Sequence, residues 1–124
     1  MNILIIDDNE MTRAILRTIL VNAQHKVVGE ASNGKAGIEA ARKLMPQVIF
    51  LDIVMPDSNG LDILKEILAI VPKAIVLMVT GKNDADTVKT ALQGGAKGFI
   101  VKPFNASTVL DALKGAVLRA VKAS

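Results

Sequence analysis

Five polar residues each stand at the end of a short apolar run, and together they supply three carboxylates, a hydroxyl and an ammonium: Asp7, Asp8, Asp52, Thr80 and Lys102. Two carboxylates about 5 Å apart repel by roughly 3 kcal/mol at an effective dielectric constant near 20. Three of them together therefore require a cation or a shifted pKa. Because only oxygen ligands are available, the suitable ion is Mg²⁺. A metal, an ammonium and a hydroxyl around one reactive carboxylate favour phosphoryl transfer.

Each of these residues also has an ordinary structural interpretation. Asp7 or Asp8 could cap the helix that follows. Thr80 could be a plain strand-end hydroxyl, and Lys102 a solvated surface charge. Asp52 is harder to explain in this way, because it interrupts an apolar stretch and a lone carboxylate is costly to bury. The occurrence of all five at the ends of apolar runs favours one shared site.

The elements that must position these side chains follow two alternating periodicities. Short runs rich in β-branched residues are typical of strands buried on both faces of a parallel sheet. They are Ile3–Ile6, Lys26–Gly29, Val48–Leu51, Ala74–Val79 and Lys97–Val101. Between these runs, apolar residues recur at helical spacing, as at Leu61, Leu64, Leu68 and Val71. The sequence therefore predicts five strand–helix units.

Turn and capping residues mark the ends of the predicted helices. Asn33 and Asn59, each followed by Gly, are typical of helix starts, and Gly94-Gly95 is typical of a left-handed helix stop. Asn105 is placed to cap the last helix. We predict an α/β fold, a (βα)5 doubly wound parallel sheet with helices on both faces. In the strand order 2-1-3-4-5, the carboxyl ends of strands one and three meet where the order reverses, which is where sites form.

Composition narrows the remaining classes of function. The 124 residues are 51% hydrophobic and 22% charged, which indicates a single domain over residues 1–124. Cys is absent and His25 is the one histidine, which excludes thiolate and His-pair metal sites. An aromatic content of 2% argues against nucleic acid as a partner. We expect a cytoplasmic chain with no membrane partner, since it has neither a secretory signal nor an apolar stretch of about 18 residues.

The net charge of +3 comes from scattered basic residues, not from a block of consecutive Lys or Arg. Arg13 and Arg17, among others, look like members of solvated helix faces.

Blocks of residues along essentially the whole chain resemble the response-regulator receiver domain. The blocks are Ile5–Asn9, Leu51–Pro56, Asn59–Leu61, Val79–Gly81 and Gly98–Phe104, and both their order and their spacing match. The resemblance implies a flavodoxin-like fold and a stand-alone, chemotaxis-type regulator. It also implies that the chain is a phosphoacceptor switch and not an enzyme.

The resemblance assigns a role to each acidic position. Asp52 would be the phosphoacceptor. Asp7 and Asp8 would hold Mg²⁺ together with Asp52 and the backbone carbonyl of Val54.

The same resemblance assigns the basic, hydroxyl and aromatic positions. Thr80 would turn its hydroxyl onto the phosphoryl group, and Lys102 would bond a phosphoryl oxygen. The Lys102–Pro103 peptide is expected to be cis. Phe99 stands at the position of the switch aromatic, which rotates inward when Thr80 moves, although an ordinary strand residue would fit there too.

Two positions that vary in receivers are expected to tune autodephosphorylation. They are Val54 and Lys82, each two residues beyond a site residue. An apolar Val54 cannot orient an attacking water, so we predict slow hydrolysis of the phosphorylated form. Lys82 would either contact the phosphoryl group or point to solvent.

The implied partners are a histidine kinase or phosphotransfer protein, which donates to Asp52, and a downstream protein target. The target would bind the surface of the fourth helix, fifth strand and fifth helix, and a phosphorylation-dependent dimer is left open. A phosphatase of the aspartate-nucleophile type is disfavoured, because it would need Asp-x-Asp after the first strand and here Asp7 and Asp8 are adjacent. An FMN carrier fits poorly, because Asp7 and Asp8 would repel its phosphate. A degenerate receiver used only for binding is disfavoured by the five retained residues.

Overall fold

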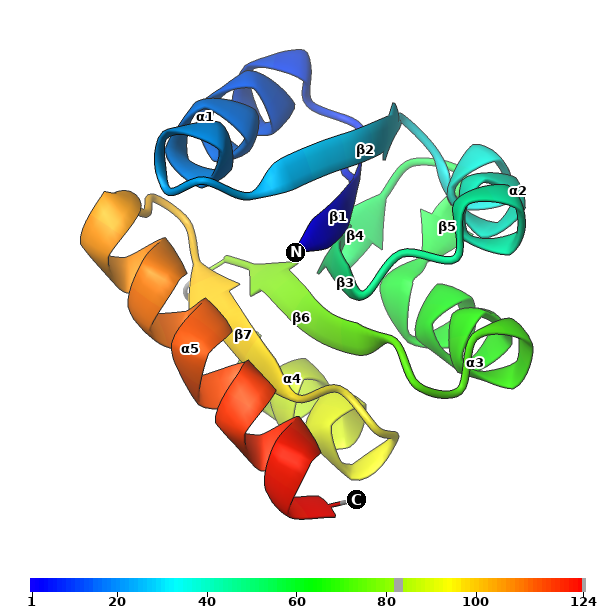
Figure 1. Ribbon diagram of the computed structural model, residues 1–124. Coiled ribbons are helices and arrows are strands. Elements are labelled where there is room, and N and C mark those ends of the chain that lie inside the picture. Colours follow the sequence, from blue (N-terminus) through cyan, green and yellow to red (C-terminus); the bar gives the residue numbers. More distant parts are fainter. Residues whose placement is uncertain (82–83, 124) are drawn as a thin grey trace.

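The computed structural model describes residues 1–81 and 84–123, and its centre is a five-stranded parallel sheet (Figure 1). The strands are β1 (Asn2–Ile6), β2 (Lys26–Ala31), β3 (Val48–Asp52), β6 (Ile75–Thr80) and β7 (Gly98–Val101). They are ordered β2-β1-β3-β6-β7, and every neighbouring pair is parallel. Counted as five sheet strands along the chain, this is the predicted order 2-1-3-4-5, so the predicted doubly wound α/β fold is confirmed.

Helices cover both faces of the sheet, as Figure 1 shows. They are α1 (Glu10–Asn22), α2 (Gly34–Leu44), α3 (Gly60–Ile70), α4 (Ala85–Gln93) and α5 (Ala106–Ala123). Helices α1 and α5 pack on one face, and α2, α3 and α4 pack on the other. None of the helices in the described part of the chain has both the length and the apolar character that a membrane span requires.

The first strand shows why its sequence is apolar without alternation. Ile3, Leu4, Ile5 and Ile6 are all fully buried. Successive side chains of a strand point to opposite faces, so Ile3 and Ile5 join the core under α1 and α5 while Leu4 and Ile6 join the core under α2, α3 and α4. Each such burial contributes about 1.5–3 kcal/mol. A polar residue is therefore tolerated only where the strand reaches the edge of the sheet.

The predicted helix ends are also confirmed. The side chains of Asn33 and Asn59 cap α2 and α3 by accepting backbone N–H groups of the first turn. Asn105 Oδ1 accepts from the backbone N–H of Thr108 at 2.9 Å at the start of α5. After α4, Gly95 adopts the left-handed conformation with φ 111°.

The segment that follows β3 is more regular than the sequence indicated. Two short antiparallel strands, β4 (Val54–Met55) and β5 (Ser58–Asn59), form a hairpin before α3. At the start of α3, a Cβ atom on Gly60 would lie 2.6 Å from the Cα of Ile53 and 2.8 Å from the carbonyl oxygen of Asp52. Only glycine permits this approach, which fixes the backbone immediately after Asp52.

Candidate functional site

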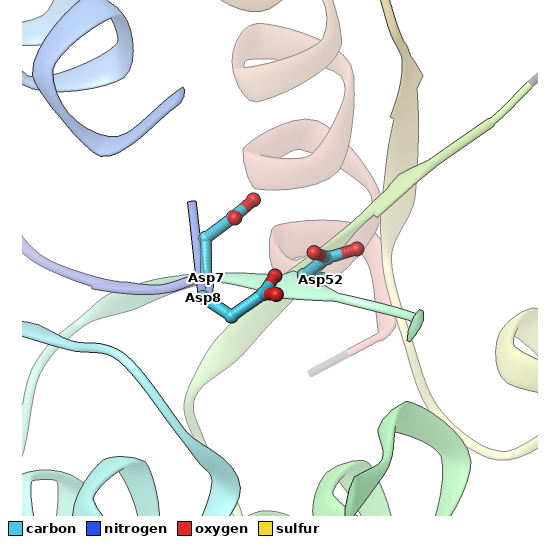
Figure 2. Close-up of side chains that lie close together, drawn as sticks. All are labelled: Asp7, Asp8 and Asp52. Carbon is cyan, nitrogen blue, oxygen red and sulfur yellow. The ribbon is translucent and has the colours of Figure 1, made fainter. Parts of the chain in front are cut away.

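Three carboxylates converge at the carboxyl edge of β1 and β3 (Figure 2). Asp7 and Asp8 follow β1, and Asp52 is the last residue of β3. The two strands are neighbours with Ile6 paired to Leu51, so the residues that come next lie side by side. Each carboxylate offers an oxygen, and these oxygens lie within 4.8 Å of one another. Asp7 and Asp52 are buried and Asp8 is exposed.

Neither Asp7 nor Asp8 caps α1. That role belongs to Asn9, whose Oδ1 accepts from the backbone N–H of Thr12 at 2.9 Å. The backbone N–H of Asn9 in turn donates to Asp7 Oδ1 at 2.8 Å. The interpretation of the two aspartates as a helix cap is therefore wrong, and both side chains are free to face the shared edge.

Arg13 braces the loop that carries the two aspartates. Its Nη1 donates to the carbonyl oxygen of Asp7 at 2.7 Å, and its Nε lies 3.3 Å from the carboxylate of Glu30 on β2. Arg17 pairs with Glu30 as well. The Arg13 side chain is only 17% exposed, so its placement on a solvated helix face was wrong. The sequence holds no signal for this contact, because it depends on β2 lying beside β1.

Lys102 reaches the acidic cluster from the loop after β7. Its Nζ lies 3.3 Å from Asp52 Oδ2 and 3.4 Å from Asp7 Oδ2, so it is not a solvated surface charge. Its backbone N–H donates to the carbonyl oxygen of Thr80 at 2.7 Å, and its peptide bond to Pro103 is cis. The end of β6 and the turn after β7 thus hold the ammonium over the two buried carboxylates.

The Lys102 ammonium does not by itself compensate for the repulsion among the carboxylates. Burial, and after it the negative charge of Asp7, raise the pKa of Asp52 to about 6, although Lys102 and the backbone N–H of Val54 favour the ionised form. Burial by itself would lower the pKa of Lys102, but the charges of Asp52 and Asp7 outweigh it and raise that pKa. Further positive charge near Asp7, Asp8 and Asp52 would therefore stabilise their ionised forms.

The residues present fit a hard divalent cation. Asp7 Oδ2 is buried and, among the residues that the structure describes, accepts no hydrogen bond. Lys102 Nζ, 3.4 Å away, forms an ion pair with this oxygen that is long for a hydrogen bond, so the buried oxygen can take a further positive partner. The cluster offers only oxygen ligands, which Mg²⁺ prefers. Val54, which is expected to add its carbonyl, begins β4 two residues after Asp52, and the residue is 67% exposed.

Thr80 and Phe99 lie on the next two strands of the sheet. Thr80 ends β6 and is buried, whereas Phe99 on β7 is 43% exposed. Both residues line a groove of about 530 Å³ between α4 and β7. The Thr80 hydroxyl lies 3.2 Å from Asp84 Oδ2, a residue that sequence reasoning missed. Lys82, the second predicted tuning residue, lies outside the described residues.

The raised pKa of Asp52 predicts that the metal-free protein loses stability as the pH rises. The folded state binds the Asp52 proton with a pKa of about 6, against an ordinary value of 3.8. The stabilising contribution is therefore complete below the ordinary value and is lost as the pH passes through 6. Between pH 5 and 7.5 we expect a loss of about 1 kcal/mol in the free energy of unfolding, measured with urea in the presence of EDTA. Asp52→Asn should lack this part of the loss, and an identical pH profile for that variant would contradict the assignment.

Known proteins are similar to this chain in sequence and fold. A profile of the response regulator receiver domain matches residues 3–114. The chemotaxis protein CheY of Thermotoga maritima is 40% identical over 111 residues, which cover 90% of this chain and 92% of that protein. The nitrate/nitrite response regulator protein NarL of Escherichia coli is 38% identical over 112 residues, which cover 90% of this chain and 52% of NarL.

Solved structures agree with this match. A response regulator receiver domain protein from Clostridium thermocellum superposes with a TM-score of 0.88 at 29% identity, over 99% of this chain and 98% of that one. The response regulator domain of Thermotoga maritima CheB gives a TM-score of 0.82 at 32% identity, over 97% of this chain and 96% of that one. With its acidic edge, its fold and these relatives in agreement, the chain belongs to the response regulator receiver domain family.

Proposed function

We propose that this chain is a phosphorylation switch in which Asp52 accepts a phosphoryl group from a histidine kinase or phosphotransfer protein with Mg²⁺ bound. The observation that carries the proposal is the position of Asp52, buried at the sheet edge with Lys102 on one oxygen and Asp7 and Asp8 beside it. Membership of the receiver family supports it, and so do the relatives CheY and NarL.

In the proposed reaction, one carboxylate oxygen of Asp52 attacks the phosphorus atom of the donor. The bond from phosphorus to the donor atom breaks, its electron pair stays with the donor, and an acyl phosphate forms on Asp52. When bound, Mg²⁺ supplies positive charge to the transferring phosphoryl oxygens. Asp7 and Asp8 would hold that ion together with Asp52 and the carbonyl of Val54.

The remaining site residues act on the phosphoryl group itself. Lys102, already 3.3 Å from Asp52 Oδ2, would offset the added negative charge and donate to a phosphoryl oxygen. The Thr80 hydroxyl would donate to another phosphoryl oxygen after turning toward Asp52. Because Asp52 is consumed in each event and restored by hydrolysis, the chain acts as a phosphoacceptor and not as an enzyme with a separate substrate.

Two surfaces would serve the two kinds of partner. The donor would approach the start of α1 beside Asp8, where Met11 is 69% exposed. The downstream target would bind the surface of α4, β7 and α5, where Phe99 lines the same groove as Thr80. A movement of Thr80 would change the space available to Phe99 and so alter that surface, with a phosphorylation-dependent dimer as one form of the response.

Acetyl phosphate and Mg²⁺ should add one phosphoryl group to the protein, as measured by intact-protein mass spectrometry. Asp52→Asn should abolish the addition, because an amide cannot form the acyl phosphate, and EDTA should abolish it in the unaltered protein. Asp57→Asn is the matched control, since Asp57 is an exposed aspartate five residues further on, and it should leave the addition intact. Phosphorylation that survives in Asp52→Asn would refute the proposal.

Because the side chain of Val54 is apolar, we predict slow hydrolysis of the phosphoryl group on Asp52. Val54→Gln should speed that loss by about tenfold, because an amide can orient an attacking water where an isopropyl group cannot. Val54→Leu keeps the side chain apolar and should decay like the unaltered protein. The measurement is the decay of phosphorylated protein by mass spectrometry after removal of acetyl phosphate. Equal decay rates in Val54→Gln and Val54→Leu would count against a role for this position.

A further inference from the structure

Asp84 accepts a hydrogen bond from the Thr80 hydroxyl. In the proposed reaction, that hydroxyl would donate to the phosphoryl group instead. Its Oδ2 lies 3.2 Å from Thr80 Oγ1 and 3.3 Å from the backbone nitrogen of Gly81. The Thr80 hydroxyl also lies 3.1 Å from the carbonyl oxygen of Gly81. A hydroxyl has a single proton to donate, and a charged acceptor makes a hydrogen bond roughly twice as strong as a neutral one. The carboxylate of Asp84 is therefore the preferred partner of Thr80.

This contact diverts Asp84 from the role that its position suggests. Asp84 immediately precedes α4, yet its side chain makes no hydrogen bond to the N–H groups of that helix. Its backbone, with φ −105° and ψ 31°, also departs from the extended conformation of the capping residues Asn9, Asn33 and Asn59. The N–H groups of the first turn of α4 therefore do not donate to the Asp84 side chain, whose carboxylate would be able to accept from them if it were released.

The structure shows Asp84 hydrogen-bonded to Thr80 and not capping α4, and both roles involve the same groove. Thr80, Asp84 and Phe99 all line the space between α4 and β7. A phosphoryl group on Asp52 would replace one carboxylate charge with about two, a net gain of about one negative charge at the edge of the sheet, and would compete for the hydrogen bond of the Thr80 hydroxyl. Once Thr80 donates to the phosphoryl group, Asp84 loses its hydroxyl donor, keeps the backbone N–H of Gly81 and becomes able to accept from the N–H groups of α4.

We propose that Asp84 is a positioning residue that holds the Thr80 hydroxyl away from Asp52 in the unphosphorylated protein. This inference rests on the proposed phosphorylation of Asp52. Phosphorylation redirects the hydrogen bond of the Thr80 hydroxyl from Asp84 to the phosphoryl group. The released carboxylate then caps the first turn of α4, and this exchange of partners carries the signal from the acidic edge to the groove.

The first test is the steady-state ratio of phosphorylated to unphosphorylated protein at a low acetyl phosphate concentration with Mg²⁺. Asp84→Ala removes the competing acceptor and should raise this ratio by about tenfold, and Asp84→Asn, which keeps a neutral acceptor, by less. Asp86→Ala is the matched control, because it removes the same charge from the exposed first turn of α4, and it should leave the ratio unchanged. An equal rise in Asp86→Ala would mean that only the net charge near α4 matters and would overturn the proposal.

A double-mutant cycle with Thr80→Val separates the hydrogen bond from a general effect of the carboxylate. Valine has the shape of threonine without the hydroxyl, so Asp84→Ala should no longer raise the phosphorylated fraction in that background. A rise of the same size in both backgrounds would show that Asp84 does not act through Thr80.

The third readout is NMR, first of the unphosphorylated protein. The Thr80 side chain should occupy one χ1 rotamer in the unaltered chain and average over several in Asp84→Ala, and a single rotamer in both would overturn the proposal. After phosphorylation, the backbone N–H groups of Asp86 and Thr87 should exchange more slowly in the unaltered chain but not in Asp84→Ala. If acetyl phosphate does not label the unaltered protein at all, the proposed function fails, while the rotamer measurement still decides whether Asp84 holds Thr80.

Discussion

Three carboxylates offer oxygens within 4.8 Å of one another, and the rest of the structure must offset their mutual repulsion. Burial makes it more severe, since Asp7 and Asp52 are shielded from water and the pKa of Asp52 rises to about 6. Among the described residues, the Lys102 ammonium pairs with both buried carboxylates, but its distance to Asp7 Oδ2 is too long for a full hydrogen bond. The apolar strands beneath supply the stability that allows such a cluster to persist.

Specific contacts anchor the two loops that carry these carboxylates. Arg13 ties the loop of Asp7 to β2 through Glu30, and the approach of Gly60 to the backbone fixes the residues after Asp52. The hydroxyl of Thr80, by contrast, has two candidate acceptors within the described residues and a third that would arrive with the phosphoryl group. A site of this design anchors its acidic side chains and leaves the Thr80 hydroxyl able to change its hydrogen-bond acceptor.

Much of this could be predicted from the sequence, because strands buried on both faces cannot contain polar residues. The first polar residue after each apolar run therefore marks the edge of the sheet, and Asp7, Asp52 and Thr80 all stand there. Contacts that depend on side-chain direction across neighbouring elements left no such signal. Arg13 looked like any residue of a solvated helix face until β2 placed Glu30 beside it.

For Asp84, the sequence pattern indicates a role that the structure does not show. An aspartate before an amphipathic helix is typical of a cap, and only the geometry shows its carboxylate facing Thr80 and Gly81 instead. The hairpin of β4 and β5 was likewise missed, because two-residue strands are too short for any periodicity to appear. Position along the chain located the site, and local geometry was needed to find the partners of its side chains.

The most direct measurement of the central claim is Mg²⁺ binding at pH 7.5 by titration calorimetry, paired with urea unfolding in EDTA, for the unaltered chain and Asp8→Ala. Asp8 is exposed, so its removal should leave the fold intact while taking away one ligand and one repelling charge. The account predicts one ion bound per chain, an affinity weakened by about tenfold in Asp8→Ala, and a metal-free variant that is more stable than the unaltered protein. Equal affinities, or a variant that is less stable without metal, would contradict it.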